Sequence, residues 1–363
     1  MTAAHGMAPK RATFPRLSAK VVISALAAVA IQLALVAAWA GAMGKPALHE
    51  QPVGLVVVPP GGSVAAPAIS VRPADAVSWR PLPDAATATR AVRHGDLAGA
   101  LVVRDGRQTL LVASAGGAAT AQALTQVFTG QAQATGAAFQ VRDLRPLHSD
   151  DPRGLGVFVL VLGWVIGGYA GAMLLVRAFG PRVRRMGGMV GLLISLAGYA
   201  VAAAALGVLL IDPLLGMVTG HPAELIGVGA LLVFAVAAFA TAMLTLMGPA
   251  GLMVAVATLV ILGNPASGGM VPVSMLPDGW RFLGEVLPNA AGVHLVRAVS
   301  YFGGHGISDP LIVLICYAGA ALLVTTAVTW RRRKTAPRMS AAAMARDEVE
   351  SMELAIAASG TAL

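Results

Sequence analysis

Residues 264–304, NPASGGMVPVSMLPDGWRFLGEVLPNAAGVHLVRAVSYFGG, form the stretch on which the organisation of this chain depends. The stretch is mildly polar, is rich in proline and glycine, and separates two hydrophobic runs near the C-terminus. A half-apolar, turn-rich segment in this position predicts short helices at the outer face of a membrane, where they would close the mouth of a translocation path. That interpretation depends on the topology of the hydrophobic runs around it.

The overall composition is that of an integral membrane protein. Hydrophobic residues make up 57% of the 363 residues, charged residues only 12%, and the mean hydropathy is +0.75, whereas a soluble domain carries about 25% charged residues. The chain has 26 Lys and Arg against 17 Asp and Glu, and the basic residues lie in short patches beside hydrophobic runs. Because this is the pattern of the positive-inside rule, we expect the lipid bilayer, and no nucleic acid, to be the partner of these patches.

The hydrophobic runs predict six membrane crossings. The first, residues 21–43, follows the basic residues 1–20 and spans roughly 35 Å at 1.5 Å per residue, which is enough to cross a bilayer. A cleaved signal peptide is the alternative, since residues 37–44 (AAWAGAMG) resemble a cleavage site, but signal h-regions usually have only about 7–15 residues. The other expected crossings form a five-helix transmembrane domain within residues 154–334: 155–176, 187–211, 223–247, 250–263 and 311–330.

The charges beside these runs predict the orientation of the chain. The uninterrupted apolar part of the fifth run, residues 250–262, has only 13 residues and could form a re-entrant half-helix. The cluster Arg331-Arg332-Arg333-Lys334 after the last run favours the cytoplasm, which requires the fifth run to cross. We therefore expect a multi-pass protein of the cell membrane, with residues 1–20 and the tail 335–363 in the cytoplasm and residues 264–304 as an external re-entrant or interfacial segment.

Residues 44–153 predict a small extracytoplasmic α+β domain between the first two crossings. Val53–Val58 predicts a buried strand, and Asp84 is expected to cap a helix that ends at His94. Residues 97–103 and 108–113 predict a hairpin, residues 118–133 a second helix, and residues 139–144 a last strand. Four residues near the membrane are expected to be solvated linker residues rather than metal ligands: His49, His148, Asp150 and Asp151.

Two sets of residues are candidates for packing and gating. Glycines recur every fourth residue in the second crossing and predict close helix packing: Gly163, Gly167 and Gly171. Within residues 264–304, we expect a short interfacial helix over 277–287, anchored by Trp280, and a second helix capped by Asn289 that reaches Phe302. The alternative is an ordinary amphipathic loop. The residues expected to form an external gate are Asn264, Pro265, Gly268, Gly269, Pro277, Trp280, Pro288 and Arg297.

Several kinds of chemistry are missing from the sequence. No GxxxxGK[ST] motif is present, so the chain is not expected to hydrolyse nucleotides by the P-loop route. Cys316 is the only cysteine, which excludes an internal disulfide and disfavours a thiol active site. No catalytic constellation, cofactor site or metal site is expected. No ionisable residue lies deep within a predicted crossing, and this disfavours an ion-coupled carrier.

The order of these features resembles the permeases of ABC-2 type exporters. The resemblance rests on the order of five features: one crossing, an external α+β domain, five more crossings, a basic loop after the second crossing, and a Pro/Gly-rich re-entrant segment before the last crossing. VGLVVV followed by ATRAVRHGDLAGALVV (residues 53–58 and 88–103) is similar to the domain of members with a large insertion after helix one. Residues 151–175 and 264–304 are similar to actinobacterial members. Phage-infection-protein-like membrane proteins share the end segments, but their long coiled coil is missing here.

The resemblance implies a permease that forms a homodimer or heterodimer and is driven by a separate P-loop ATP-binding subunit. The loop after the second crossing would dock on that subunit, with Arg177, Arg182, Arg184 and Arg185 as coupling candidates; topology-setting charge is the simpler interpretation of each arginine. The expected cargo is an amphipathic drug, a lipid or an envelope precursor. The alternative is a non-transporting scaffold or accessory protein of a secretion or cell-envelope system.

Overall fold

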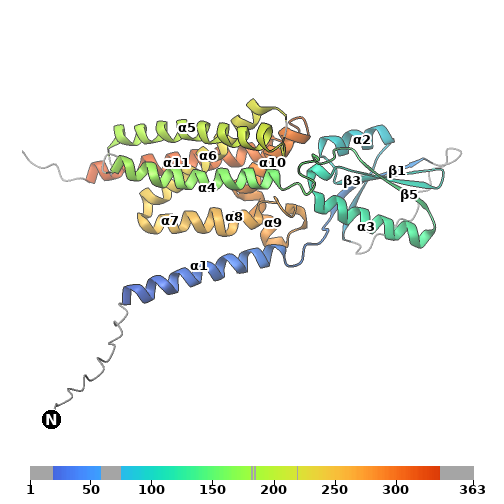
Figure 1. Cartoon of the computed structure of the whole chain (residues 1–363), viewed down its shortest axis with the longest axis horizontal. Coiled ribbons are helices and arrows are strands. Elements are labelled where there is room, and N and C mark those ends of the chain that lie inside the picture. Colours follow the sequence, from blue (N-terminus) through green and yellow to red (C-terminus); the bar gives the residue numbers. More distant parts are fainter. Residues whose placement is uncertain (1–18, 59–74, 181–182, 184, 219, 336–363) are drawn as a thin grey trace, which may run out of the picture.

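The structure, a computed structural model, describes residues 19–58, 75–180, 183, 185–218 and 220–335. A bundle of long helices occupies one part of the molecule, and a small α+β domain lies at one end of that bundle (Figure 1). Residues 336–363 of the predicted tail 335–363 lie outside the described residues, as do residues 1–18 of the N-terminus, Arg182 and Arg184.

Six helical stretches among the described residues are, by length and composition, able to cross a membrane, which is consistent with the expected polytopic membrane protein. Each apolar run is helical because a segment in lipid must satisfy its backbone polar groups internally. The long helices are α1 (Ala19–Met43), α4 (Gly156–Phe179), α5 (Met186–Leu209, continued by the π-helical turn η3, Leu210–Leu214), α6 (Pro222–Met247) and α11 (Ser308–Thr335).

The fifth span is assembled from three consecutive pieces: α7 (Pro249–Val256), the π-helical segment η4 (Ala257–Leu262) and α8 (Gly263–Ala266). Together they form a helical stretch of 18 residues, long enough to be a candidate span. The fifth span therefore runs three residues beyond the expected crossing 250–263, because Asn264, Pro265 and Ala266 form its last helical turn. Pro265 is tolerated there because a π-helical segment precedes it and the irregular turn leaves room for a proline.

Helix α6 is the centre of the bundle and packs against α4, α5 and α11. Trp164 of α4 lies in a hollow that two glycines provide: a Cβ on Gly207 would lie 2.5 Å from its Nε1, and one on Gly229 would lie 2.6 Å from its Cζ2. Helix α1 packs less closely than the other long helices, since only 11% of its most apolar stretch is buried inside the molecule. Figure 1 shows α1 leaning away from the other helices toward its N-terminus.

The α+β domain contains a five-stranded sheet in the order β2-β1-β3-β4-β5. Only β3 and β4 pair antiparallel; the other neighbours are parallel. The strands are β1 (Gln51–Val58), β2 (Val77–Pro81), β3 (Gly99–Arg104), β4 (Arg107–Val112) and β5 (Ala138–Asp143). The predicted hairpin is present as β3–β4, whereas β2, which the sequence did not predict, extends the sheet beside β1.

Two helices cover the two faces of this sheet, as the alternation of side chains requires. Leu101 and Leu110 face α3 (Ala118–Thr135) and pack with its Leu124 and Phe128. The adjacent strand residues, such as Ala100 and Leu111, lie on the opposite face with Ala88 and Val92 of α2 (Ala85–His94).

Helix α2 begins as the sequence predicts. The Asp84 carboxylate accepts a hydrogen bond from the Thr87 amide at 2.7 Å, and this bond lowers the pKa of Asp84.

Asp151 joins the domain to α4 and is not the solvated linker residue that the sequence suggested. Its side chain is only 2% exposed and accepts hydrogen bonds from the amides of Leu155 and Gly156 at 2.8 and 2.7 Å. These two amides belong to the start of α4, where backbone donors have no partner within the helix. Asp151 therefore acts as a buried cap. Its neighbour Asp150 keeps an exposed carboxylate, whose Oδ2 lies 3.5 Å from Nδ1 of His148.

Candidate functional site

The segment after the fifth span folds into a 3₁₀ turn, η5 (Val273–Met275), and two helices, α9 (Asp278–Val286) and α10 (Pro288–Tyr301). Eleven of the 14 residues of α10 are buried, and the helix packs against α4, α6 and α11. Helix α10 is thus an inserted helix of the bundle and not a surface helix. Helix α9 matches the interfacial expectation better, since Phe282 and Val286 are exposed on it.

Asn289 does not cap α10 as predicted. The helix begins with Pro288, and Leu287 is the residue before it. The Asn289 side chain instead points across to the fifth span, where its Nδ2 donates to the Leu259 carbonyl at 2.9 Å and to Oδ1 of Asn264 at 2.8 Å. Gly263 makes this approach possible, because a Cβ there would lie 2.5 Å from Asn289 Oδ1.

Arg297 holds the loop that connects α8 to η5. Its two terminal nitrogens donate to the carbonyls of Gly268 and Gly269 at 2.9 and 3.0 Å. Gly268 has φ 72°, a left-handed conformation that favours glycine. Gly269 lies against Phe158, whose Cδ2 would be 2.3 Å from an added Cβ. The structure therefore brings four of the predicted gate residues together around this loop: Gly268 and Gly269 within it, Asn264 in α8 before it, and Arg297 on α10.

The other predicted gate residues lie around this loop. Pro265 is buried in α8, and Pro277 and Pro288 stand at the starts of α9 and α10. Trp280 of α9 packs on α1, where its Nε1 would lie 3.3 Å from a Cβ on Gly41.

The segment 264–304 also forms the seam, the surface along which the α+β domain contacts the helices. Gln51, which is 2% exposed, donates to the Ser274 carbonyl at 3.2 Å. Met275 joins the core on the α3 face of the sheet. The Phe302 ring joins the core on the α2 face, beside Gly95 and Gly116, whose added Cβ atoms would lie 3.3 and 3.2 Å from it. The segment thus contacts both faces of the domain.

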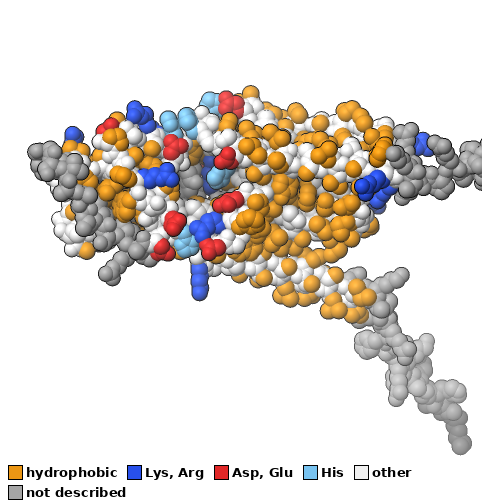
Figure 2. All heavy atoms as spheres, turned by 180° about the vertical axis from the view of Figure 1, so that it is seen from behind, with side chains coloured by type: hydrophobic (Ala, Val, Ile, Leu, Met, Phe, Trp, Pro, Cys, Tyr) orange, Lys and Arg blue, Asp and Glu red, His pale blue; other side chains and the backbone are white. Residues whose placement is uncertain are grey.

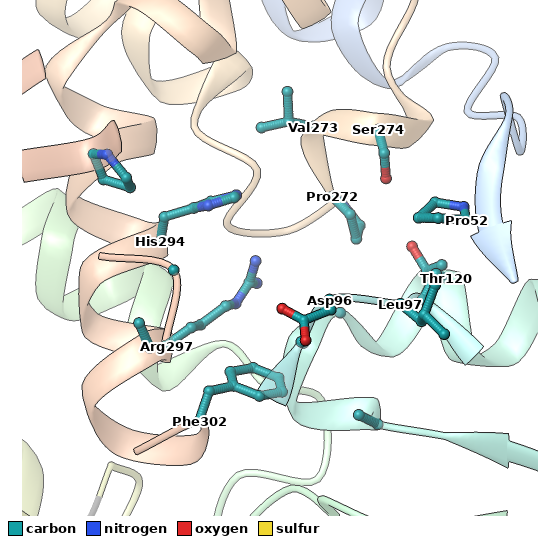
Figure 3. Close-up of a pocket in the computed structure, with 18 of the residues that line it drawn as sticks. Pro52, Asp96, Leu97, Thr120, Pro272, Val273, Ser274, His294, Arg297 and Phe302 are labelled. Carbon is teal, nitrogen blue, oxygen red and sulfur yellow. The ribbon is translucent and has the colours of Figure 1, made fainter. Parts of the chain in front are cut away.

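A cavity of about 800 Å³ lies at this seam. One wall comes from the domain, from β1, the turn after α2 and the start of α3; the other comes from η5, α9, α10 and the start of α11. Figure 2 shows that side chains of both charges gather around a hollow here, between the hydrophobic surface of the helices and the domain. The cavity walls are otherwise partly apolar, with Pro52, Leu97, Val273 and Phe302 among them (Figure 3).

The charged side chains that line the cavity are buried to different extents. Three carboxylates at its rim are exposed: Asp96, Glu285 and Asp309. Arg297 is deeper, with 9% exposure, and burial lowers its pKa to about 10, so the guanidinium stays protonated at neutral pH. His294 points into the cavity (Figure 3) and so keeps accessible surface, although the protein surrounding it and the nearby Arg297 lower its pKa.

Two histidines bridge the seam. The rings of His94 from α2 and His305 from the loop before α11 stack with their centroids 3.9 Å apart. Nδ1 of His305 lies 2.7 Å from the Phe302 carbonyl, which suits a donor nitrogen at that position. The sequence indicates that His294 and Arg297 share a face of their helix, but no pattern in it reveals their juxtaposition with residues of the domain.

The predicted helix-packing glycines behave differently from one another. A Cβ on Gly171 would lie 2.3 Å from the ring of Tyr199, and Gly167 accepts a hydrogen bond from the Tyr199 hydroxyl at 2.8 Å. A Cβ on Gly163 would have no atom of the described residues within 4 Å. Close packing of α4 on α5 therefore involves Gly167 and Gly171, while Gly163 faces open space.

The predicted coupling loop lies at the end of the bundle opposite the α+β domain (Figure 1). Arg177 and Arg185 are exposed there. The C-terminal end of α11 lies at the same end, where Arg332 donates to the Thr245 carbonyl at 2.7 Å.

The described part of the chain has no group of three or more His, Cys, Asp or Glu residues that could hold a metal ion. The cavity instead combines hydrogen-bond donors, charges and apolar walls, which suits noncovalent binding of an amphipathic molecule. No protein-family model, curated protein or solved structure matches this chain.

Proposed function

We propose that this protein is the permease subunit of an ABC-2 type exporter, powered by a separate P-loop ATP-binding subunit. In this proposal the α+β domain is extracytoplasmic, both termini are cytoplasmic, and two permeases form a homodimer or heterodimer. The cargo is an amphipathic drug, lipid or envelope precursor.

One observation supports the proposal: helix α10 contacts both the helical bundle and the cavity beside the α+β domain. It packs among the membrane helices α4, α6 and α11, and it lines the cavity shared with the α+β domain. Any rearrangement of the bundle that moves α10 must change that cavity. A transporter needs this mechanical link between its membrane path and its exit, whereas a scaffold does not.

The gate would be the loop after α8, which Arg297 holds in place, together with the end of the fifth span, which Asn289 holds. Opening it requires breaking the hydrogen bonds of Arg297 to Gly268 and Gly269 and those of Asn289 to the fifth span. Both glycines allow the loop backbone to change conformation at low cost. Only the four-residue helix α8 separates the π-helical segment η4 from this loop, and π-helical segments are common at functional sites.

The coupling surface would be the loop between α4 and α5. Its exposed Arg177 and Arg185 lie at the end of the bundle away from the domain, where a cytoplasmic subunit would bind if the domain is outside. Exposed arginines suit bidentate pairing with carboxylates of such a partner.

Purification of the tagged, full-length protein from the membranes of its native host tests the proposal. We expect a P-loop ATPase to co-purify and the complex to hydrolyse ATP. A double variant, Arg177→Glu with Arg185→Glu, should lose the ATPase without a change in thermal stability. The matched control is Arg104→Glu with Arg107→Glu, two exposed arginines of the β3–β4 turn, which should keep it. A stable protein that carries no ATPase would favour the scaffold interpretation.

Cysteine labelling tests the orientation separately. In a Cys316→Ala background, a membrane-impermeant maleimide added to intact cells should label Ala134→Cys on α3 and should label Arg332→Cys only after lysis. The reverse pattern would overturn the topology and, with it, the assignment of the coupling loop.

A further inference from the structure

The floor of the seam cavity contains an uncapped helix terminus. Helix α3 has 18 residues and begins after Gly117, which has no side chain to cap its first turn. The first amides of a helix have no partner within the helix and carry the positive end of its dipole. Gly117 and Thr120 both line the cavity, so this terminus lies at its wall, beside Pro272, whose Cγ would be 2.5 Å from a Cβ on Gly117.

A second observation at the same place is independent of the helix terminus. Thr120 is only 7% exposed, and its hydroxyl has no hydrogen-bond partner among the described residues. Figure 3 shows the hydroxyl directed into the cavity, toward Pro272 and Pro52. An unpaired buried hydroxyl costs free energy, and a ligand atom that bonds to it would remove that cost.

A protonated guanidinium completes the floor. Arg297 lines the main cavity and also a small recess that it shares with Gly117. No described carboxylate lies within ion-pair distance of Arg297, and only two of its five possible donors bond to the loop carbonyls. Asp96 faces Arg297 in Figure 3 without forming an ion pair.

We infer that this floor, made of Gly117, Thr120 and Arg297, binds the anionic headgroup of an amphipathic ligand. Phosphate and carboxylate oxygens accept hydrogen bonds from helix N-terminal amides, from hydroxyls and from guanidinium groups. The apolar walls at Pro52, Leu97 and Phe302 would contact the rest of the molecule. Glu285 and Asp309 are exposed, and water and salt screen them. Asp96 faces Arg297 (Figure 3) and is the carboxylate that opposes the anion.

As a statement about cargo, this inference rests on the proposed exporter function, but binding can be tested without it. The purified full-length protein, in a nonionic detergent, is titrated calorimetrically with hexyl phosphate, inorganic phosphate and hexanol. We expect hexyl phosphate to bind most tightly. Inorganic phosphate binding equally well would identify a free anion as the ligand, and weaker phosphate binding would identify a lipid-like one. Hexanol binding as tightly as hexyl phosphate would overturn the inference.

Three variants sharpen the test. Thr120→Val should weaken hexyl phosphate binding by about tenfold or more, the usual effect of losing a hydrogen bond to a charged group. The thermal stability of the unliganded variant should stay the same or rise, because valine fills the same volume without an unpaired hydroxyl. Thr135→Val, at the other end of α3, is the control and should not change affinity.

Asp96→Asn distinguishes an anionic from a cationic ligand at the same floor. Removing the carboxylate that faces Arg297 should tighten the binding of hexyl phosphate. Weaker binding by Asp96→Asn, or unchanged binding by Thr120→Val, would refute the site. Failure to find an ATPase partner would refute the exporter function and leave these binding results unaffected.

Discussion

Nδ2 of Asn289 donates a hydrogen bond to Oδ1 of Asn264 at 2.8 Å, and this bond joins the first turn of α10 to the last turn of the fifth span. Both side chains are buried, at 0% and 5% exposure. The same Nδ2 also reaches the Leu259 carbonyl inside the π-helical segment η4. Asn289 is therefore the main polar contact through which α10 is positioned on the fifth span.

Replacing Asn289 by alanine should lower the free energy of unfolding by about 1–3 kcal/mol, because two buried acceptors lose their donor. Thermal unfolding of the purified protein in detergent measures this. The control is Ser195→Ala, whose hydroxyl bonds only to Gly191 of its own helix and whose loss should have a smaller effect. Equal effects of both changes would mean that the Asn289 contacts contribute little.

The glycines of α4 should differ in their tolerance of a methyl group. Gly171→Ala places a Cβ 2.3 Å from the Tyr199 ring and should destabilise the protein by about 1–3 kcal/mol, as overpacking does. Gly163→Ala meets nothing within 4 Å among the described residues and should be neutral or stabilising by up to about 1 kcal/mol, since alanine favours helix. Unfolding curves of both variants, recorded under the same conditions, provide the comparison. A destabilised Gly163→Ala variant would contradict this assignment of the packing face.

Asp151 should matter more for stability than its neighbour Asp150. Asp151→Ala removes the acceptor of two amides at the start of α4 and should cost about 1–2 kcal/mol, a typical value for a lost helix cap. Asp150→Ala removes only an exposed carboxylate and should change stability by less than about 0.5 kcal/mol. Chemical or thermal unfolding distinguishes the two, and similar losses for both would argue against the cap.

The stability of the protein should depend on the protonation of His294. The protein around the ring and the nearby Arg297 lower the pKa of His294 below the ordinary value of 6.5 although the ring keeps accessible surface, so the unfolded chain binds the proton more readily than the folded chain does. Stability is therefore retained above about pH 6.5 and declines as the pH falls from that value toward the lowered pKa.

His294→Gln should reduce this decline when melting temperatures are recorded across that pH window. His221→Gln, at a largely exposed site, serves as the control and should leave the pH dependence as it is. An unchanged decline in His294→Gln would assign the effect to other groups.

Local patterns in the sequence were sufficient for the elements themselves. The length of each apolar run predicts a helix, because lipid leaves its backbone no other partners. The alternation of side chains and the turn at residues 104–107 predict β3 and β4, and Asp84 predicts the start of α2. Strand β2 was missed because Val77–Pro81 is short and contains a proline, a combination that weakens a strand signal but is tolerated at the sheet edge where β2 lies.

The candidate site depends on contacts that no local pattern encodes. Asn289 precedes an apolar run as a helix cap would, yet its side chain bonds to residues 25 and 30 positions away. Asp151 looked like a solvated linker residue because burial of a charge cannot be recognised without the two amides that compensate it.

The sequence alone therefore determined the membrane-spanning runs and the local elements of the α+β domain, since these follow from periodicity, length and capping within short windows. Only the tertiary structure decided that α10 inserts into the bundle and that Thr120 and Arg297 meet at one cavity. Such contacts arise from the packing of segments far apart in the sequence, where shape and the pairing of buried polar groups select one arrangement.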